Sequence, residues 1–179
     1  MQSPSRRDTP KPMTLDLQVL ALTLFAVVMA VAAFEDFRRF VIPNLLPILL
    51  CAAWPAYFAA APSLVGGLAA IGCALAVFLA GAVLFARGYL GGGDVKLLSA
   101  AALWAGPAGL ATLLLLTAVL GGALALFLLL PVGGQLATAA RLMLGQPAFP
   151  ATRGLAMPIP YGVAIAAAAF IVVVSPYLG

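Results

Sequence analysis

Apolar runs occupy nearly the whole stretch between residues 15 and 178, and this feature constrains the fold more than any other. A membrane-spanning helix needs about 20 apolar residues, so several crossings fit. Hydrophobic residues make up 65% of the chain and charged residues 8%. A separate soluble domain would need about 50 or more residues of ordinary polarity, and no such stretch is present. The sequence therefore predicts an integral membrane protein built as one all-helical bundle.

Proline, glycine and charged residues divide the apolar runs into six expected membrane segments. These segments cover approximately residues 15–35, 41–60, 64–86, 94–104, 108–130 and 159–174. Residues 1–13 are polar and are expected to be a disordered tail, with residues 14–179 forming a single membrane-embedded domain. Residues 135–144 are expected to form a short helix on the membrane surface.

The fourth segment is the shortest, because Gly106 and Pro107 follow it closely. From Asp94 to Trp104 a helix rises only about 16 Å, roughly half of the hydrocarbon thickness of a bilayer. This segment either crosses a locally thinned bilayer or dips in and returns on the same side. The distribution of basic residues favours the crossing.

Basic residues indicate which face each loop occupies. With six crossings, the loops after segments one, three and five share one face and carry Arg38, Arg39, Arg87, Lys96, Arg141 and Arg153. Cytoplasmic loops are enriched in Lys and Arg, so this face is expected to be cytoplasmic, with both termini outside. The basic residues of the N-terminal tail argue against this orientation, but they are fewer, and nearby acids offset part of their charge.

The inventory of reactive side chains excludes several kinds of site. The chain has no histidine, which rules out a Ser-His-Asp triad, a Cys-His pair and an imidazole-based metal site. Its two cysteines, Cys51 and Cys73, each lie inside an apolar run and are expected to be buried, unpaired thiols.

Two of the five acidic residues, Asp36 and Asp94, are expected at the same membrane face. Segment one ends at Asp36 and segment four begins at Asp94, so their carboxylates should lie at similar depth. Two carboxylates held close together can share one proton and activate water against an amide. Each acid also has an ordinary interpretation, Asp36 as a solvated helix end and Asp94 as a helix N-cap.

A glycine run precedes Asp94 and removes side-chain bulk beside its carboxylate. Another backbone or a substrate strand can approach this acid closely as a result. The run lacks the Gly-x-x-x-x-Gly-Lys-Ser/Thr pattern of a phosphate-binding loop. Lys96 is expected to anchor the segment at the membrane interface.

Three blocks of the sequence resemble the type IV prepilin peptidases. The family's first block is similar to Asp36-x-Arg38-x-x-x-Ile42-Pro43-Asn44, and its Gly-x-Gly-Asp-x-Lys block to Gly91-Gly92-Gly93-Asp94-Val95-Lys96. The family's last helix is similar to the stretch that begins Ile159-Pro160-Tyr161-Gly162. The short chain lacks the large cytoplasmic loop and four-cysteine zinc motif of longer relatives, and so looks like the compact members of tight-adherence pilus systems.

This resemblance implies an aspartyl endopeptidase of the bacterial inner membrane that removes the leader of Flp-like pilin precursors at the cytoplasmic face. It places the family's catalytic aspartates on Asp36 and Asp94, one accepting a proton from water and the other protonating the substrate. No cofactor or metal is implied, and methylation of the product is not expected. The implied partners are the pilin precursor and the lipid bilayer, with no nucleic acid. Residues expected to shape the site or bind substrate are Gly91, Gly92, Gly93, Lys96, Arg38, Pro43, Asn44 and Tyr161.

Two functions of other classes stay open from the residues alone. A proton-coupled carrier would also place rare acids inside a helix bundle, although the sequence shows no clear internal repeat. A noncatalytic pilus-assembly subunit would use the same acids only as helix caps.

Overall fold

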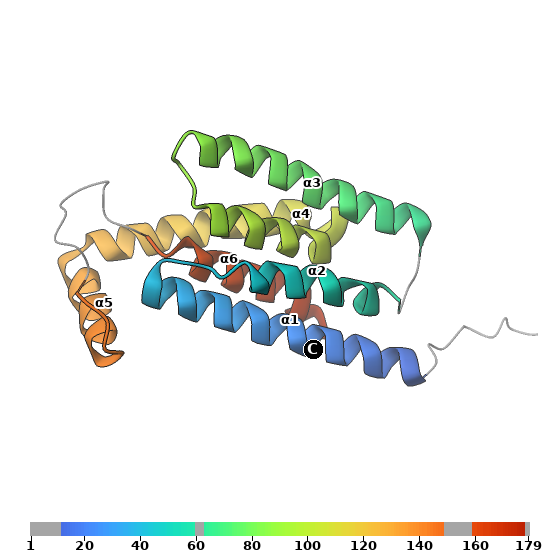
Figure 1. Cartoon of the computed structure of the whole chain (residues 1–179), viewed down its shortest axis with the longest axis horizontal. Helices are drawn as coiled ribbons and strands as arrows, with labels where there is room; N and C mark the ends of the chain where they lie inside the picture. Colours follow the sequence, from blue (N-terminus) through green and yellow to red (C-terminus); the bar gives the residue numbers. More distant parts are fainter. Residues whose placement is uncertain (1–11, 60–62, 149–158, 178–179) are drawn as a thin grey trace, which may run out of the picture.

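The computed structural model describes residues 12–59, 63–148 and 159–177, and its regular structure in these ranges is entirely helical (Figure 1). The helices are α1 (Pro12–Arg39), α2 (Leu45–Phe58), α3 (Leu64–Ala86), α4 (Gly92–Leu129), α5 (Pro131–Met143) and α6 (Tyr161–Ala169). A π-helical turn, Phe170–Val174, and a 3-10 turn, Ser175–Tyr177, continue α6. The all-helical prediction is confirmed. Most of the expected disordered tail lies outside the described residues, but Pro12 and Met13 already belong to α1.

Three helical stretches are long and apolar enough to cross a bilayer: Asp16–Arg39, Leu64–Ala86 and Gly92–Leu129. Two further apolar helices, Leu45–Phe58 and Tyr161–Tyr177, are shorter. Large apolar side chains are exposed along α1, α3 and α4, as expected for helices that face lipid. The chain is therefore a multi-pass membrane protein, and the number of six crossings stays a prediction.

A break at Gly106 divides α4 into two parts. Gly106 has φ 60° and ψ −172°, a conformation that glycine adopts without the steric cost of a Cβ atom. Pro107 follows and has no backbone N–H to continue the hydrogen-bond ladder. In Figure 1 the chain turns sharply here, and the second part of α4 runs back past the first. The sequence predicted the boundary between the fourth and fifth segments at this Gly-Pro pair.

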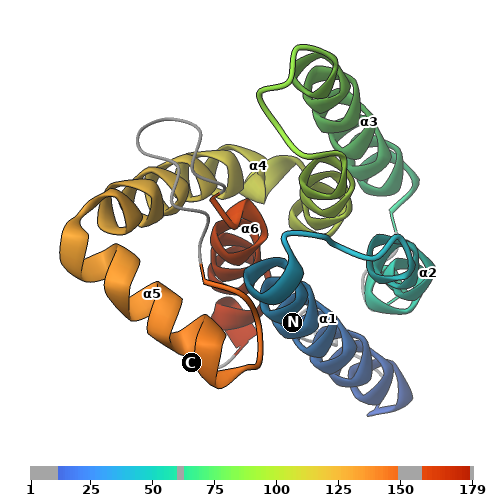
Figure 2. The same ribbon diagram turned by 60° about the vertical axis from the view of Figure 1, so that its left-hand side comes forward.

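Trp104 joins three helices in the core. Its ring centroid lies 4.7 Å from that of Phe25 in α1, and its Nε1 donates a 3.0 Å hydrogen bond to the carbonyl of Leu50 in α2. Figure 2 shows α6 between α1 and the second part of α4, and it packs against both. Most of the side chains that α6 buries are alanines, and small side chains allow close helix packing in membranes. The first part of α4 and the start of α6 are thus fixed close to α1.

The second helix begins later than predicted. A segment starting at residue 41 was expected, whereas α2 starts at Leu45 and has 14 residues. Pro43 lies before the helix, and Asn44 occupies the N-cap position without making a side-chain capping bond. The side-chain oxygen of Asn44 instead accepts a hydrogen bond from Lys96 of α4, which explains the uncapped start.

A helix is present over the expected residues as α5, which begins at Pro131 rather than at residue 135, and its place on the membrane surface stays a prediction. Proline suits the first turn of a helix because its missing N–H would have no partner there. α5 packs against α4 and is steeply inclined to α1 at one end of the bundle (Figure 1).

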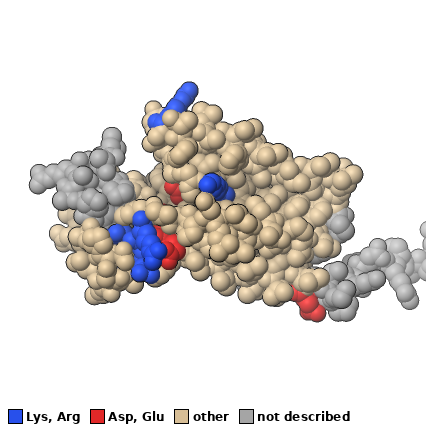
Figure 3. Space-filling model, in the orientation of Figure 1, with Lys and Arg blue, Asp and Glu red and all other residues tan. Residues whose placement is uncertain are grey.

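Basic side chains of the described residues gather over one end of the molecule (Figure 3). This is the end at which α1 finishes and α4 starts (Figure 1). Acidic atoms are visible toward both ends of the bundle, near the basic side chains at one end and near the N-terminal end of α1 at the other. The bundle is therefore polarised in charge along its length.

Candidate active site

The end of α1 is built by Phe40, which has a φ of 54°. Its N–H donates a 2.8 Å hydrogen bond to the carbonyl of Asp36. This is the usual C-terminal capping bond of a helix that is followed by a residue in the left-handed conformation. The chain then leaves α1 through residues 41–43 and brings the buried side chain of Ile42 back beside the helix end. This turn sets one wall of the site.

Arg141 of α5 holds this helix end from the other side. Its Nη1 donates a 2.6 Å hydrogen bond to the carbonyl of Phe37, and its Nε donates to the carbonyl of Pro147 at 3.2 Å. The guanidinium carbon lies 4.6 Å from the centroid of the Phe40 ring. The side chain is buried, and a cation at a helix C-terminus is favoured by the helix dipole. From the sequence, Arg141 was expected only as a basic residue of a loop.

Asp36 lies in the last turn of α1 and is 5% exposed. Its Oδ2 accepts a 2.7 Å hydrogen bond from the N–H of Gly162, in the first turn of α6. N–H groups of a first helical turn have no partner within the helix, so they are available to an acid. A Cβ atom on Gly162 would lie 2.8 Å from this Oδ2, which means that only glycine allows the approach. This glycine belongs to a motif of the sequence, but no role was predicted for it.

Asp94 lies in the first turn of α4, after the glycine run. Its Oδ1 is buried and has no hydrogen-bond partner among the described residues. Its Oδ2 lies over Gly91, where an added Cβ atom would be 2.7 Å away. Gly93 faces Ile42, and an added Cβ atom there would be 3.0 Å from the Cβ of Ile42. The glycines therefore allow the start of α4 to approach the turn after α1.

Both acids line one cavity of about 230 Å³. Its complete lining is Asp36, Phe40, Val41, Ile42, Gly91, Gly92, Gly93 and Asp94. Two carboxylates in one cavity disfavour each other's ionisation, so the pair can hold one proton between them. The arrangement can thus present a base and an acid to the same small molecule or peptide bond.

The other residues predicted for the site fall into two groups. Asn44 and Lys96 meet through a 2.7 Å hydrogen bond and line a second, larger groove next to the acid cavity. Arg38, Pro43 and Tyr161 line neither the cavity nor this groove. Arg38 lies over the ring of Phe34 in its own helix.

Tyr161 packs against α4 at Gly121, where an added Cβ atom would be 2.6 Å from its ring. Its contact fixes the start of α6, next to the Gly162 N–H that binds Asp36. Tyr161 therefore helps to position the Gly162 N–H that binds Asp36, although it does not line the cavity itself.

The described residues hold two free thiols and no cluster of possible metal ligands. Cys51 and Cys73 are both unpaired, as predicted, but neither is fully buried. Cys73 is half-buried, and Cys51 is exposed because it lies on the face of α2 that lines the larger groove. Within the described ranges, no three or more His, Cys, Asp or Glu side chains are grouped so that they could hold a metal ion.

The fold and the cavity together define a multi-pass helical membrane protein with two acids that line one cavity at one end of the bundle. The sequence matches the model of the type IV leader peptidase family over residues 23–126, more than half of the chain, and the protein belongs to this family. The matched region contains both acids and the glycine run. Comparisons with curated proteins and with solved structures gave no match.

Proposed function

We propose that this protein is an aspartyl endopeptidase that cleaves the leader from Flp-like type IV pilin precursors. The observation that carries the proposal is the position of Asp36 and Asp94 on one cavity, although 58 residues separate them in the chain. The membership of the leader peptidase family supports peptide-bond cleavage as the reaction and a pilin precursor as the substrate.

The chemistry follows from two carboxyl groups that hold one proton. The ionised carboxylate accepts a proton from water while the water oxygen bonds to the scissile carbonyl carbon. The protonated carboxyl group donates its proton to the carbonyl oxygen, which gives a neutral tetrahedral intermediate. The carbon–nitrogen bond then breaks: the amine leaves with a proton from the carboxyl group, and one hydroxyl of the intermediate returns a proton to the other carboxylate. The products are a new carboxyl terminus and a new amino terminus, and the pair again holds one proton.

The cavity has room for this reaction. Each water molecule occupies about 30 Å³ in the liquid, so a space of 230 Å³ accepts a water together with part of an extended peptide. The glycine side of the cavity presents backbone rather than side chains, which suits a substrate strand.

The orientation proposed for the site is cytoplasmic, in the bacterial inner membrane. All five Lys and Arg residues in the described ranges, Arg38, Arg39, Arg87, Lys96 and Arg141, are close in sequence to helix ends at the charged end of the bundle. Basic residues favour the cytoplasmic side, and the acid cavity is at this same end. The leader of a membrane-anchored precursor would therefore meet the acids at the inner membrane face.

The test uses the protein in proteoliposomes with a candidate Flp-like precursor. The wild type should release one product whose new N-terminus, read by sequencing, lies at the leader boundary. Asp36→Ala and Asp94→Ala should each leave the precursor uncut while inserting into the membrane normally. Glu35→Ala is the matched control, because Glu35 pairs with Arg39 at 3.4 Å and does not line the cavity. Substantial cleavage by either aspartate variant would refute the proposal.

A further inference from the structure

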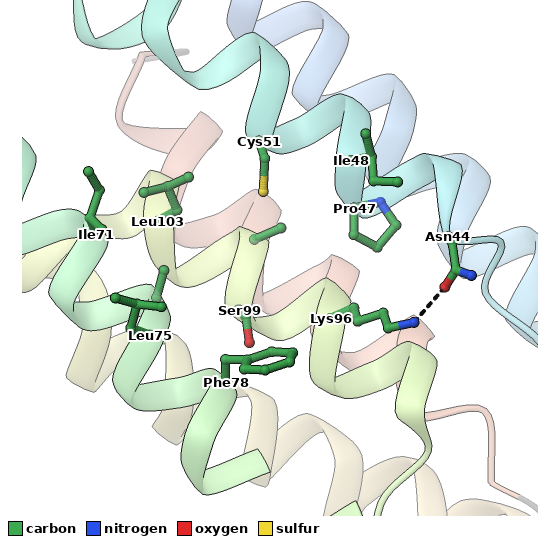
Figure 4. Close-up of a pocket in the computed structure, with 12 residues that line it drawn as sticks. Asn44, Pro47, Ile48, Cys51, Ile71, Leu75, Phe78, Lys96, Ser99 and Leu103 are labelled. Atoms are coloured by element: carbon green, nitrogen blue, oxygen red, sulfur yellow. Dashed lines mark hydrogen bonds between the residues drawn. The ribbon is translucent and has the colours of Figure 1, made fainter. Parts of the chain in front are cut away.

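A groove of about 630 Å³ lies between α2, α3 and α4, next to the acid cavity (Figure 4). Its lining is mostly apolar, and its polar side chains are Asn44, Lys96 and Ser99. Ser99 donates a 2.7 Å hydrogen bond to the carbonyl of Val95, so its hydroxyl proton is already used within α4. The groove is therefore suited to an apolar ligand over most of its length.

The groove continues from the acids along α4. Asp94 lines the cavity, and Lys96, Ser99, Ala100 and Leu103 line the groove on the same helix. At 1.5 Å per residue, the distance along α4 from Asp94 to Leu103 is about 14 Å. Figure 4 shows the hydrogen-bonded pair Asn44–Lys96 at one end of the groove, away from Cys51 and Leu103. Because Lys96 is two residues after Asp94 on α4, this is the end near the acids.

The shape of the groove favours a helix over a single lipid chain. Ala74, Ser99 and Ala100 supply small side chains, which let another helix backbone approach closely. Larger side chains, including Ile71, Phe78 and Leu103, stand around them. An apolar helix recognised in this way contacts the groove through residues spaced three and four apart.

The Asn44–Lys96 end of the groove can supply hydrogen bonds to the backbone of a substrate near its scissile bond. A peptide must be extended to be hydrolysed, so its backbone groups lose their helical partners at that point. Asn44 accepts from Lys96 through Oδ1, and its side-chain NH₂ group can donate to a peptide carbonyl. Lys96 makes no ion pair with an acid among the described residues, so the groove is cationic where it meets the cavity.

We propose that this groove binds the membrane-spanning helix of the precursor, in the segment that directly follows the scissile bond. The inference rests on the proposed function, because it assigns the binding site of that same substrate. The helix lies along α4 in the apolar groove, and its extended start passes the Asn44–Lys96 pair to reach the two acids.

Cys51 provides a native probe for this assignment, since it lines the groove and is exposed. The experiment uses Cys73→Ser to leave one thiol, Asp94→Asn to prevent cleavage, and precursors with single cysteines along the helix. Oxidation with copper phenanthroline in proteoliposomes should give disulfides at positions spaced three or four apart. Cys51 is about 9 Å along α2 from Leu45, so the first of these should be roughly five to ten residues after the scissile bond.

Two controls make the result specific. An enzyme that keeps only Cys73, which does not line the groove, should give no periodic disulfides with the same precursors. In the otherwise native enzyme, Leu75→Trp should raise the KM for the precursor about tenfold, because it fills the groove. Leu79→Trp, a similarly exposed leucine on α3 that does not line the groove, should leave KM within about twofold of wild type.

The outcomes separate this inference from the proposed function. Cleavage by the wild type without periodic disulfides at Cys51 would mean that lipid alone fills the groove, and would overturn the assignment while the peptidase activity stands. Absence of cleavage by the wild type would refute the proposed function, whatever the disulfide pattern. Periodic disulfides together with a raised KM in Leu75→Trp would establish the groove as the helix-binding site.

Discussion

The acid cavity and the apolar groove lie on the same helix, yet they differ in almost every property. The cavity is small, is lined by the buried Asp36 and the half-buried Asp94, and is bounded by glycines and a helix end fixed by Arg141. The groove is nearly three times larger, is lined mainly by aliphatic side chains, and faces outward between three helices. On the proposed function, the chemistry takes place in the first region and substrate binding in the second.

This division has a kinetic consequence. Interactions that act only in the transition state affect kcat, whereas interactions with a remote, unreactive part of the substrate affect KM when they are the same in both states. Changes in the cavity should therefore lower kcat, and changes in the groove should raise KM. The variants below test this assignment region by region, with rates measured against precursor concentration.

The largest effect is expected for Gly162→Ala. The added Cβ atom would lie 2.8 Å from Oδ2 of Asp36 and 2.9 Å from Cδ1 of Ile42, so it must displace both the acid and the cavity wall. We expect kcat to fall about 100-fold with little change in KM, because general acid–base catalysis contributes about that much or more.

Gly122→Ala is the control for this variant, because an added Cβ atom there meets nothing within 4 Å. It should retain wild-type kinetics. If Gly162→Ala keeps its kcat and instead shows a raised KM, the separation of the two regions is wrong.

A smaller loss is expected for Gly91→Ala. The new Cβ atom would lie 2.7 Å from Oδ2 of Asp94, but this oxygen is at the end of a side chain that can turn away. We expect kcat to fall about tenfold, since the acid stays in the cavity in a changed position. Stopped assays with quantified product will show this, and an unchanged kcat would mean that the orientation of Asp94 does not matter.

Several parts of this structure were predictable because local chemistry determines them. The Gly106-Pro107 break follows from the lack of a backbone donor and from a φ that glycine tolerates, and it was expected at this pair. The apolar runs likewise define α1, α3 and α4 to within a few residues at most ends. The start of α2 was misplaced because residues 41–43 form the turn that buries Ile42 beside the end of α1, a contact that local sequence does not reveal.

The contacts that complete the site depend on tertiary packing and leave little trace in the sequence. Gly162 reaches Asp36 across 126 residues only because α6 packs against α1. Arg141 has the sequence context of a headgroup anchor, but the fold buries it against Phe37 and Phe40. The apolar groove combines faces of three helices, so no single segment carries its pattern.

Arg141→Ala should change stability more than substrate binding. It removes two hydrogen bonds from a buried cation and its contact with the Phe40 ring, which together stabilise the fold by about 2–3 kcal/mol. Thermal unfolding in detergent should show a Tm lower by roughly 5 °C or more.

Arg141 contacts the ring of Phe40, which lines the cavity. The kcat of Arg141→Ala should therefore also fall about threefold to fivefold, with KM unchanged. Arg141→Lys should recover part of the stability, since the charge remains near the helix end. Arg87→Ala alters an exposed basic residue and should leave Tm unchanged. An equal loss of Tm in Arg87→Ala would show that net charge, rather than the buried contacts, is responsible.

The smallest effect is expected where the two regions meet, at the hydrogen bond from Lys96 to Asn44. A charged hydrogen bond at an exposed position contributes about 1 kcal/mol, so Lys96→Met and Asn44→Leu should each raise KM about fivefold. If the two side chains act as one unit, the double variant should lose no more than either single variant. Additive losses would mean that each residue contacts the precursor independently. A fall in kcat instead of a rise in KM would place this pair with the acids, because an interaction that strengthens only in the transition state belongs to the chemistry.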